Sequence, residues 1–110
     1  MTEAAFQAKL LRALRQRLPQ AVIVKIADRF TGGLPDVMVS LNGVVTWFEL
    51  KVGYNPVKVI QWETLRRLKR GYVVRELRGV INLQLAGYTA EGPYDFAVLV
   101  DRIVQICGSD

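Results

Sequence analysis

The sequence predicts a single α/β domain, residues 1–110, in which helices flank a central mixed β-sheet in the order helix, three strands, helix, strand. Asn42-Gly43 joins two runs rich in β-branched residues, which is the strongest short-range signal for a β-hairpin. Segments with the periodicity of amphipathic helices lie on both sides of this hairpin, at 2–18 and 55–70. At 110 residues the chain is long enough to bury a core, and no linker, repeat or low-complexity segment divides it.

The composition excludes several kinds of site. The chain contains no histidine and one cysteine, Cys107, so Ser-His and Cys-His dyads cannot form and a zinc site lacks its usual ligands. Any bound metal must therefore be held by oxygen atoms. The lone cysteine fits a cytoplasmic setting, and no apolar run reaches the ~20 residues that a membrane span requires. The net charge of +5 favours a polyanionic partner.

Residues 2–18 are predicted to form the first helix, with Thr2 as N-cap. Arg12 lies off the apolar stripe and is a candidate contact for nucleic acid. Glu3 instead falls within about 20° of the stripe at 100° per residue. Its carboxylate is either a first-turn group that complements the helix dipole or a functional acid aimed at the hairpin. The stripe consists of Phe6, Leu10, Leu14 and Leu18.

A short apolar strand is predicted at 22–26, followed by a loop at 28–33. Gly32 and Gly33 let the backbone approach a ligand or adopt positive φ, although a turn required only by chain geometry is an equally good interpretation. Arg29 in this loop is a candidate contact for a phosphate, and a simply solvated arginine is the alternative.

The hairpin brings acidic residues together. With Asn42-Gly43 as a two-residue loop, Asp36 lies directly opposite Glu49, and both project from the same face as Lys51. Facing side chains are roughly 4.5–5.5 Å apart at Cβ, where like charges repel. A divalent cation between the two carboxylates is the simplest way to relieve that repulsion.

Both faces of the hairpin are largely apolar, so helices are expected to cover both. Burial raises the cost of unpartnered carboxylates at Asp36 and Glu49. The alternative is that the pair lies at exposed strand ends and binds arginines, and that Lys51 is an ordinary lysine at a sheet edge.

The second helix is predicted from Asn55-Pro56, as N-cap and first turn, to about Arg70, with Gly71 just beyond its end. Gln61 falls among the inward-facing apolar positions, where a buried amide needs partners. It is either a satisfied core amide or a functional group. Basic residues lie on the outer surface of this helix, where they either contact the phosphates of a nucleic acid or simply face water. They are Lys58, Arg66, Arg67, Lys69 and Arg70.

Three further elements complete the chain. Residues 72–77 and 80–85 alternate around Arg78-Gly79 and indicate a second hairpin. Residues 87–93 are predicted to be loop. Apolar spacing favours a helix from Tyr94 to Cys107 that stops at Gly108, with a strand at 96–100 as the alternative.

Pro35-Asp36, a hairpin and Glu49-Leu50-Lys51 together resemble the PD-(D/E)XK nuclease superfamily. The Gly-Gly-Leu-Pro-Asp lead-in and Gln61 resemble its VRR-NUC branch and the related archaeal-type Holliday junction resolvases. The resemblance covers residues 2–78. It implies a restriction-endonuclease-like core (αβββαβ) and hydrolysis of DNA phosphodiester bonds with Mg²⁺ or Mn²⁺.

The resemblance also implies roles for individual residues. Asp36, Glu49 and the Leu50 carbonyl would hold the metal, with Glu3 as a supporting ligand or second acid. Lys51 would orient water or stabilise developing charge. Gln61 would orient water or a phosphate oxygen.

Standalone members of this size resemble enzymes that cut branched DNA as homodimers, and they are frequent in phages. We therefore expect a four-way junction as substrate, no small-molecule cofactor, and a dimer interface at the second hairpin or the C-terminal helix. A nuclease acting on linear duplex or flap DNA is one alternative. A non-catalytic nucleic-acid-binding subunit is another.

Overall fold

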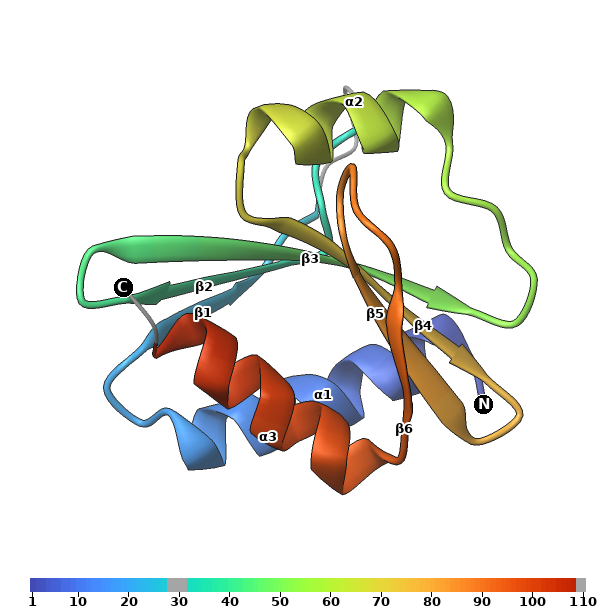
Figure 1. The fold of residues 1–110 in the computed structure, drawn as a ribbon. Coiled ribbons are helices and arrows are strands. Elements are labelled where there is room, and N and C mark those ends of the chain that lie inside the picture. Colours follow the sequence, from blue (N-terminus) through green and yellow to red (C-terminus); the bar gives the residue numbers. More distant parts are fainter. Residues whose placement is uncertain (28–31, 109–110) are drawn as a thin grey trace.

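A computed structural model describes residues 1–27 and 32–108. Within them, six strands form one sheet in the order β1-β2-β3-β4-β5-β6. Helices α1 (Glu3–Arg17) and α3 (Phe96–Cys107) cover one face and α2 (Val59–Arg67) lies on the other (Figure 1). This confirms the predicted α/β class and order. The strands are β1 (Val22–Lys25), β2 (Val37–Leu41), β3 (Val44–Val52), β4 (Gly71–Leu77), β5 (Val80–Leu85) and β6 (Glu91–Tyr94).

The β2–β3 hairpin has the predicted register. Leu41 pairs with Val44 and Val37 with Phe48. Asn42 and Gly43 both have positive φ, 53° and 80°, as a two-residue turn of this kind requires. The strand β3 then pairs in parallel with β4, which the chain reaches through α2, whereas β4 and β5 form the predicted antiparallel hairpin.

The main core lies between the sheet and the pair α1 and α3. The predicted stripe of α1 is buried, and Thr2 caps this helix by accepting a hydrogen bond from the Ala5 N–H at 3.0 Å. Alternate residues of β2 and β3 face the same core, which fixes the face on which Glu49 and Lys51 must lie. The fully buried members include Phe6, Leu10, Leu14, Val37, Val39, Phe48, Val74, Leu83, Leu99 and Ile103.

Helix α2 differs from its predicted bounds. It begins at Val59 rather than at Asn55, because the residues before it form a link whose carbonyl oxygens are bound by Arg75. It ends at Arg67 rather than Arg70, and the residue with positive φ is Lys69, at 65°. Gly71 is therefore the first residue of β4 and not the end of the helix.

Two other predictions are wrong. Residues 91–93, predicted as loop, and Tyr94, predicted as the first residue of the last helix, together form β6. Helix α3 therefore begins at Phe96, with Asp95 as its N-cap. Arg70 does not join the outer basic surface. Its guanidinium donates to the Thr46 hydroxyl and, at 2.8 Å, to the Ile106 carbonyl near the end of α3. The helical prediction for 96–107 is confirmed over the strand alternative.

Close packing of α2 on β4 requires glycine at position 71. A Cβ built there would lie 2.6 Å from the Leu65 carbonyl oxygen and 2.9 Å from the Leu65 Cα. These are backbone atoms and cannot rotate away, so a side chain would push the helix off the strand.

We expect Gly71→Ala to lower the free energy of unfolding by about 3 kcal/mol, the upper end of typical overpacking costs. Denaturant unfolding measures this loss. Gly108→Ala is the matched control, because its Cβ would lie 3.2 Å from the Val104 carbonyl oxygen and should cost less. Equal losses in the two variants would contradict the packing argument.

Candidate active site

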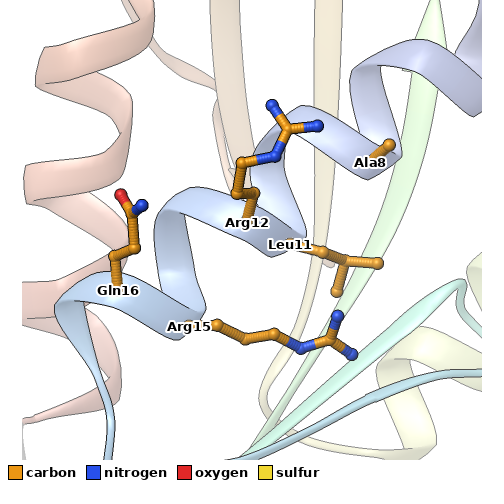
Figure 2. A pocket seen from close by; sticks show the side chains of 5 residues that line it. All are labelled: Ala8, Leu11, Arg12, Arg15 and Gln16. Atoms are coloured by element: carbon orange, nitrogen blue, oxygen red, sulfur yellow. The ribbon is translucent and has the colours of Figure 1, made fainter.

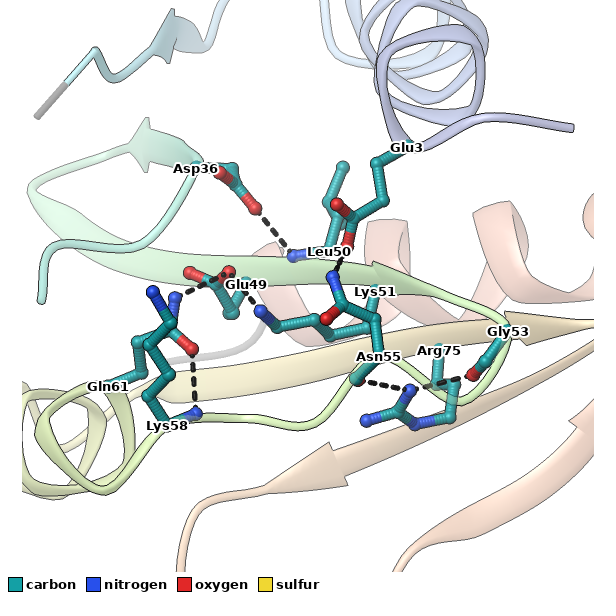
Figure 3. A network of polar contacts seen from close by, with 10 residues as sticks. All are labelled: Glu3, Asp36, Glu49, Leu50, Lys51, Gly53, Asn55, Lys58, Gln61 and Arg75. Atoms are coloured by element: carbon teal, nitrogen blue, oxygen red, sulfur yellow. Dashed lines mark hydrogen bonds and ion pairs between the residues drawn. The ribbon is translucent and has the colours of Figure 1, made fainter. Parts of the chain in front are cut away.

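A buried ion pair lies on β3, on the face of the sheet that α2 partly covers. Glu49 is 3% exposed and Lys51 5% exposed. The Lys51 Nζ lies 3.6 Å from the Glu49 Oε2 (Figure 3). Glu49 therefore does not lie at an exposed strand end, and Lys51 does not lie at an edge of the sheet, so both alternatives are wrong for these residues. Their burial follows from the central position of β3 in the sheet.

Asp36 directly precedes β2. Extending the hairpin register by one residue beyond the Val37–Phe48 pair places Asp36 opposite Glu49. Its Oδ2 accepts a hydrogen bond from the Leu50 N–H at 2.8 Å, and its carbonyl accepts one from the Ile26 N–H at 2.7 Å. Asp36 is thus fixed at the end of β2, beside the strand that carries Glu49.

Gln61 connects α2 to the acidic pair. Its Nε2 donates to the Glu49 Oε2 at 3.2 Å, and its Oε1 accepts from the Lys58 N–H at 2.9 Å at the start of the helix. The prediction that Gln61 faces inward is confirmed, and its partner is the carboxylate itself. One amide hydrogen of Gln61 remains for another acceptor.

Glu3 reaches this region from the first turn of α1. Its Oε1 accepts a hydrogen bond from the Asn55 Nδ2 at 3.1 Å. The Arg75 Nη1 in turn donates to the carbonyls of Gly53 and Asn55, each at 2.8 Å. The loop after β3 is therefore held on one side by Arg75 and joined to α1 on the other (Figure 3).

Burial is the main cause that raises the pKa values of both central carboxyls. The pKa of Glu49 rises to about 8, chiefly because burial removes water from the carboxylate and secondly because Asp36 is negative; Lys51 opposes the shift. Burial also raises the pKa of Asp36, and the hydrogen bond from Leu50 only partly offsets it. Without a further positive charge, the site therefore favours a bound proton.

The donor set fits a hard divalent cation. The Glu49 Oε1 is buried with no hydrogen-bond partner in the described part of the chain, and such an atom normally needs one. Residues 1–27 and 32–108 contain no group of three or more His, Cys, Asp or Glu able to hold a metal. Mg²⁺ is commonly bound by one or two carboxylates and keeps several waters, so Asp36 and Glu49 suit it. A ligand role for Glu3 stays a prediction.

The predicted nucleic-acid contacts are scattered. Lys58, Arg66 and Lys69 are exposed on or next to α2. Arg12 lies on the outer surface of α1, nine residues and about 14 Å along the helix from Glu3. Arg29 lies outside the described residues. A contact between any of these residues and nucleic acid stays a prediction.

Figure 2 shows Arg12 with Arg15 at a hollow of about 520 Å³ on α1. The Arg15 guanidinium donates to the Ile23 carbonyl of β1 at 3.3 Å. This hollow is built from α1 alone and contains none of the residues that gather around Glu49.

Sequence reasoning missed two residues of this network. The Asn-Pro pair predicts a helix cap at Asn55 and gives no signal that the Asn55 side chain binds Glu3. The sequence pattern around Arg75 predicts only a hairpin strand. Its position beside Lys51 follows from the parallel register of β3 and β4, which local sequence patterns do not specify.

The fold is similar to that of a solved structure. Hjc, a Holliday junction resolvase from the archaeal hyperthermophile Archaeoglobus fulgidus, matches with a TM-score of 0.62 and 17% identity, over 96% of this chain and 99% of that chain. At this identity the similarity shows a shared restriction-endonuclease-like fold and carries no activity with it. No family model and no curated protein matches the chain, so the VRR-NUC resemblance stays a prediction.

No helix within residues 1–27 and 32–108 has the length and apolar character needed to cross a membrane.

The raised pKa of Glu49 predicts how stability depends on pH in chelator. Between its ordinary value of 4.5 and about 8, the folded protein holds a proton that the unfolded chain releases. This stabilisation is complete below about pH 4.5 and is lost as pH rises through about 8. Thermal unfolding from pH 5 to 9 should therefore show a declining Tm, which Mg²⁺ should restore at high pH.

Glu49→Gln mimics the protonated carboxyl and should flatten this decline. Glu63→Gln is the matched control, because Glu63 is exposed on α2 and its variant should keep the wild-type slope. A decline of the same size in Glu49→Gln would contradict the assignment.

Proposed function

We propose that this protein is a metal-dependent endonuclease that hydrolyses DNA phosphodiester bonds. The observation that carries the proposal is the buried Glu49 carboxylate, which lies beside Asp36 and Lys51 and has one oxygen without a partner among the described residues. A fold maintains such a pair at a cost, and perturbed carboxyls of this kind concentrate at functional sites. The fold shared with a junction resolvase supports the same conclusion.

Asp36, Glu49 and the Leu50 carbonyl would hold Mg²⁺ or Mn²⁺, with Glu3 as an additional acid nearby. A divalent cation bound there supplies positive charge to the phosphate and lowers the pKa of a coordinated water. The chain itself keeps Asp36 in place through the Leu50 N–H and keeps Glu49 in place through Gln61. Both carboxylates are therefore positioned before any substrate arrives.

Lys51 and Gln61 provide donors next to these carboxylates. The Lys51 ammonium, held by the Glu49 Oε2, can bind a phosphate oxygen and stabilise the negative charge that develops as water attacks. The remaining amide hydrogen of Gln61 can orient the water or the phosphate. Because both side chains also contact Glu49, their donor atoms are fixed relative to the site.

The substrate that we propose is branched DNA, in particular a four-way junction. The net charge of +5 and the exposed Lys58, Arg66 and Lys69 on or next to α2 favour a phosphate backbone. A homodimer would match two sites to the two equivalent strands of a junction. Helix α3 buries its apolar face inside the chain, so an interface through α3 would use its polar side.

Cleavage of a labelled four-way DNA junction tests this proposal directly. With Mg²⁺ or Mn²⁺ we expect symmetric nicks in the junction, few in linear duplex or single strands, and none in chelator. Glu49→Gln should abolish cutting and keep or strengthen binding, because it removes one negative charge without removing the hydrogen bond to Gln61.

Each other outcome has a definite meaning. Cutting of linear duplex or flaps at equal rates would retain the hydrolysis and favour the restriction- or repair-type alternative. Tight binding without cutting under either metal would favour the non-catalytic subunit.

A second variant tests the role of Gln61. Gln61→Leu removes the hydrogen bond to Glu49 but keeps an apolar side chain of similar size on α2. Loss of a partner that orients a metal-binding side chain typically costs 10–100-fold, so we expect a fall of about that size in kcat with little change in KM. Glu63→Gln on the same helix should cut normally, and an equal loss there would point to a general defect of α2.

A further inference from the structure

A second concave site lies on the same face of the sheet as the acidic pair. It is a cavity of about 130 Å³ between α2 and the β4–β5 hairpin. Val73 of β4, which is 4% exposed, belongs to its lining, as do Val57 and the indole of Trp62. These residues give the cavity an apolar and partly aromatic wall.

The strand register places this cavity next to the proposed active site. Lys51 is paired with Arg75, and Arg75 with Asn82. Two residues earlier on β3, Glu49 is paired with Val73, and Val73 is paired with Gln84 on β5. Paired residues point to the same face, and neighbouring strands are about 4.8 Å apart. The cavity therefore begins one strand away from the buried ion pair.

The polar groups of the cavity include both donors and acceptors. Arg75 uses its Nη1 on the carbonyls of Gly53 and Asn55, which fixes the guanidinium and leaves Nε and Nη2 without partners in the described residues. Gln84 donates through Nε2 to the Tyr88 carbonyl at 2.8 Å, which leaves its Oε1 as an acceptor. The Asn82 amide adds a donor and an acceptor.

We propose that this cavity binds one nucleobase of the substrate, next to the phosphate that is cut. This inference rests on the proposed nuclease function and adds to it a site that reads an unpaired nucleotide. A flat π-system needs an aromatic wall, and its edge needs a mixture of donors and acceptors. Trp62 provides the first, and Arg75, Asn82 and Gln84 provide the second.

The base that enters must be unpaired. In duplex DNA the edge and both faces of a base are occupied by pairing and stacking, so only an unstacked base can insert between side chains. At a branch point the continuous stacking of the duplex is interrupted, so a base there is extruded at a lower cost than inside an intact linear duplex. The cavity thereby gives a small domain a means to prefer branched DNA without a separate recognition module.

Single abasic substitutions test the proposal. Four-way DNA junctions with one abasic nucleotide at successive positions around the branch point are titrated in chelator, so that binding is measured without cleavage. Stacking of one base on an aromatic side chain is worth enough for an affinity change on the order of ten-fold. We expect one position to weaken binding of the wild-type protein by about that factor.

The variants identify where that base binds. Trp62→Ala should weaken binding to the intact junction by a similar factor and should no longer respond to the abasic position. Asn82 is exposed, so Asn82→Ala leaves the core intact. This variant should also show a smaller loss of affinity at the abasic position than the wild type. Glu63→Gln, beside Trp62 but outside the cavity, should retain the full response.

Equal responses to the abasic position in wild type, Trp62→Ala and Asn82→Ala would overturn the proposal, as would the lack of any sensitive position in the wild type. Cleavage of the same junctions with Mg²⁺ decides the proposed function separately. A sensitive position without cleavage would support base binding in the cavity and refute the proposed nuclease activity. Cleavage without a sensitive position would support the nuclease activity and refute base binding in the cavity.

Discussion

The Glu49 carboxylate is buried on one face of the central strand β3, beside Asp36, and the geometry of the site follows from this burial. Two acids so placed repel each other, and burial removes the water that would screen them. The protein offsets this cost with Lys51, with the amide of Gln61 and with the Leu50 N–H. Within residues 1–27 and 32–108 these partners leave the Glu49 Oε1 unsatisfied. Lys51 thus supplies one positive charge against two carboxyl groups.

The position of α2 follows from the same requirement. Gln61 can contact Glu49 only if the helix packs closely on the centre of the sheet, and Gly71 allows that approach next to Leu65. Because α2 also connects β3 to β4, the close approach accompanies a parallel pairing that aligns Lys51 with Arg75. The packing of α2 on the sheet therefore positions the Gln61 amide beside Glu49. The same packing extends the row of polar side chains from Lys51 through Arg75 toward β5.

The residues of the site that could be predicted from the sequence are those positioned by the turn and the strand register of one hairpin. Asn42-Gly43 sets the hairpin register, and the register alone brings Asp36 level with Glu49. Asn55 could not be assigned, since an Asn-Pro pair suits both a helix start and a loop, and the choice depends on distant Glu3 and Arg75. The inward turn of Arg70 depends in the same way on the carbonyl of Ile106, which is far away in sequence.

The shared fold and the local electrostatics support the functional conclusion in different ways. A similarity at 17% identity shows that this chain builds a sheet and helices of a known arrangement, and many activities can occupy one fold. Stability alone does not explain a buried carboxylate that has one oxygen without a partner in the described part of the chain, because a glutamine in the same place would accept from Gln61 without repelling Asp36. A site that is costly in the folded protein and is relieved by a divalent cation is better explained by the chemistry of that cation than by the fold. The buried, perturbed carboxyl of Glu49, rather than the resemblance, is therefore the main support for the proposed catalysis.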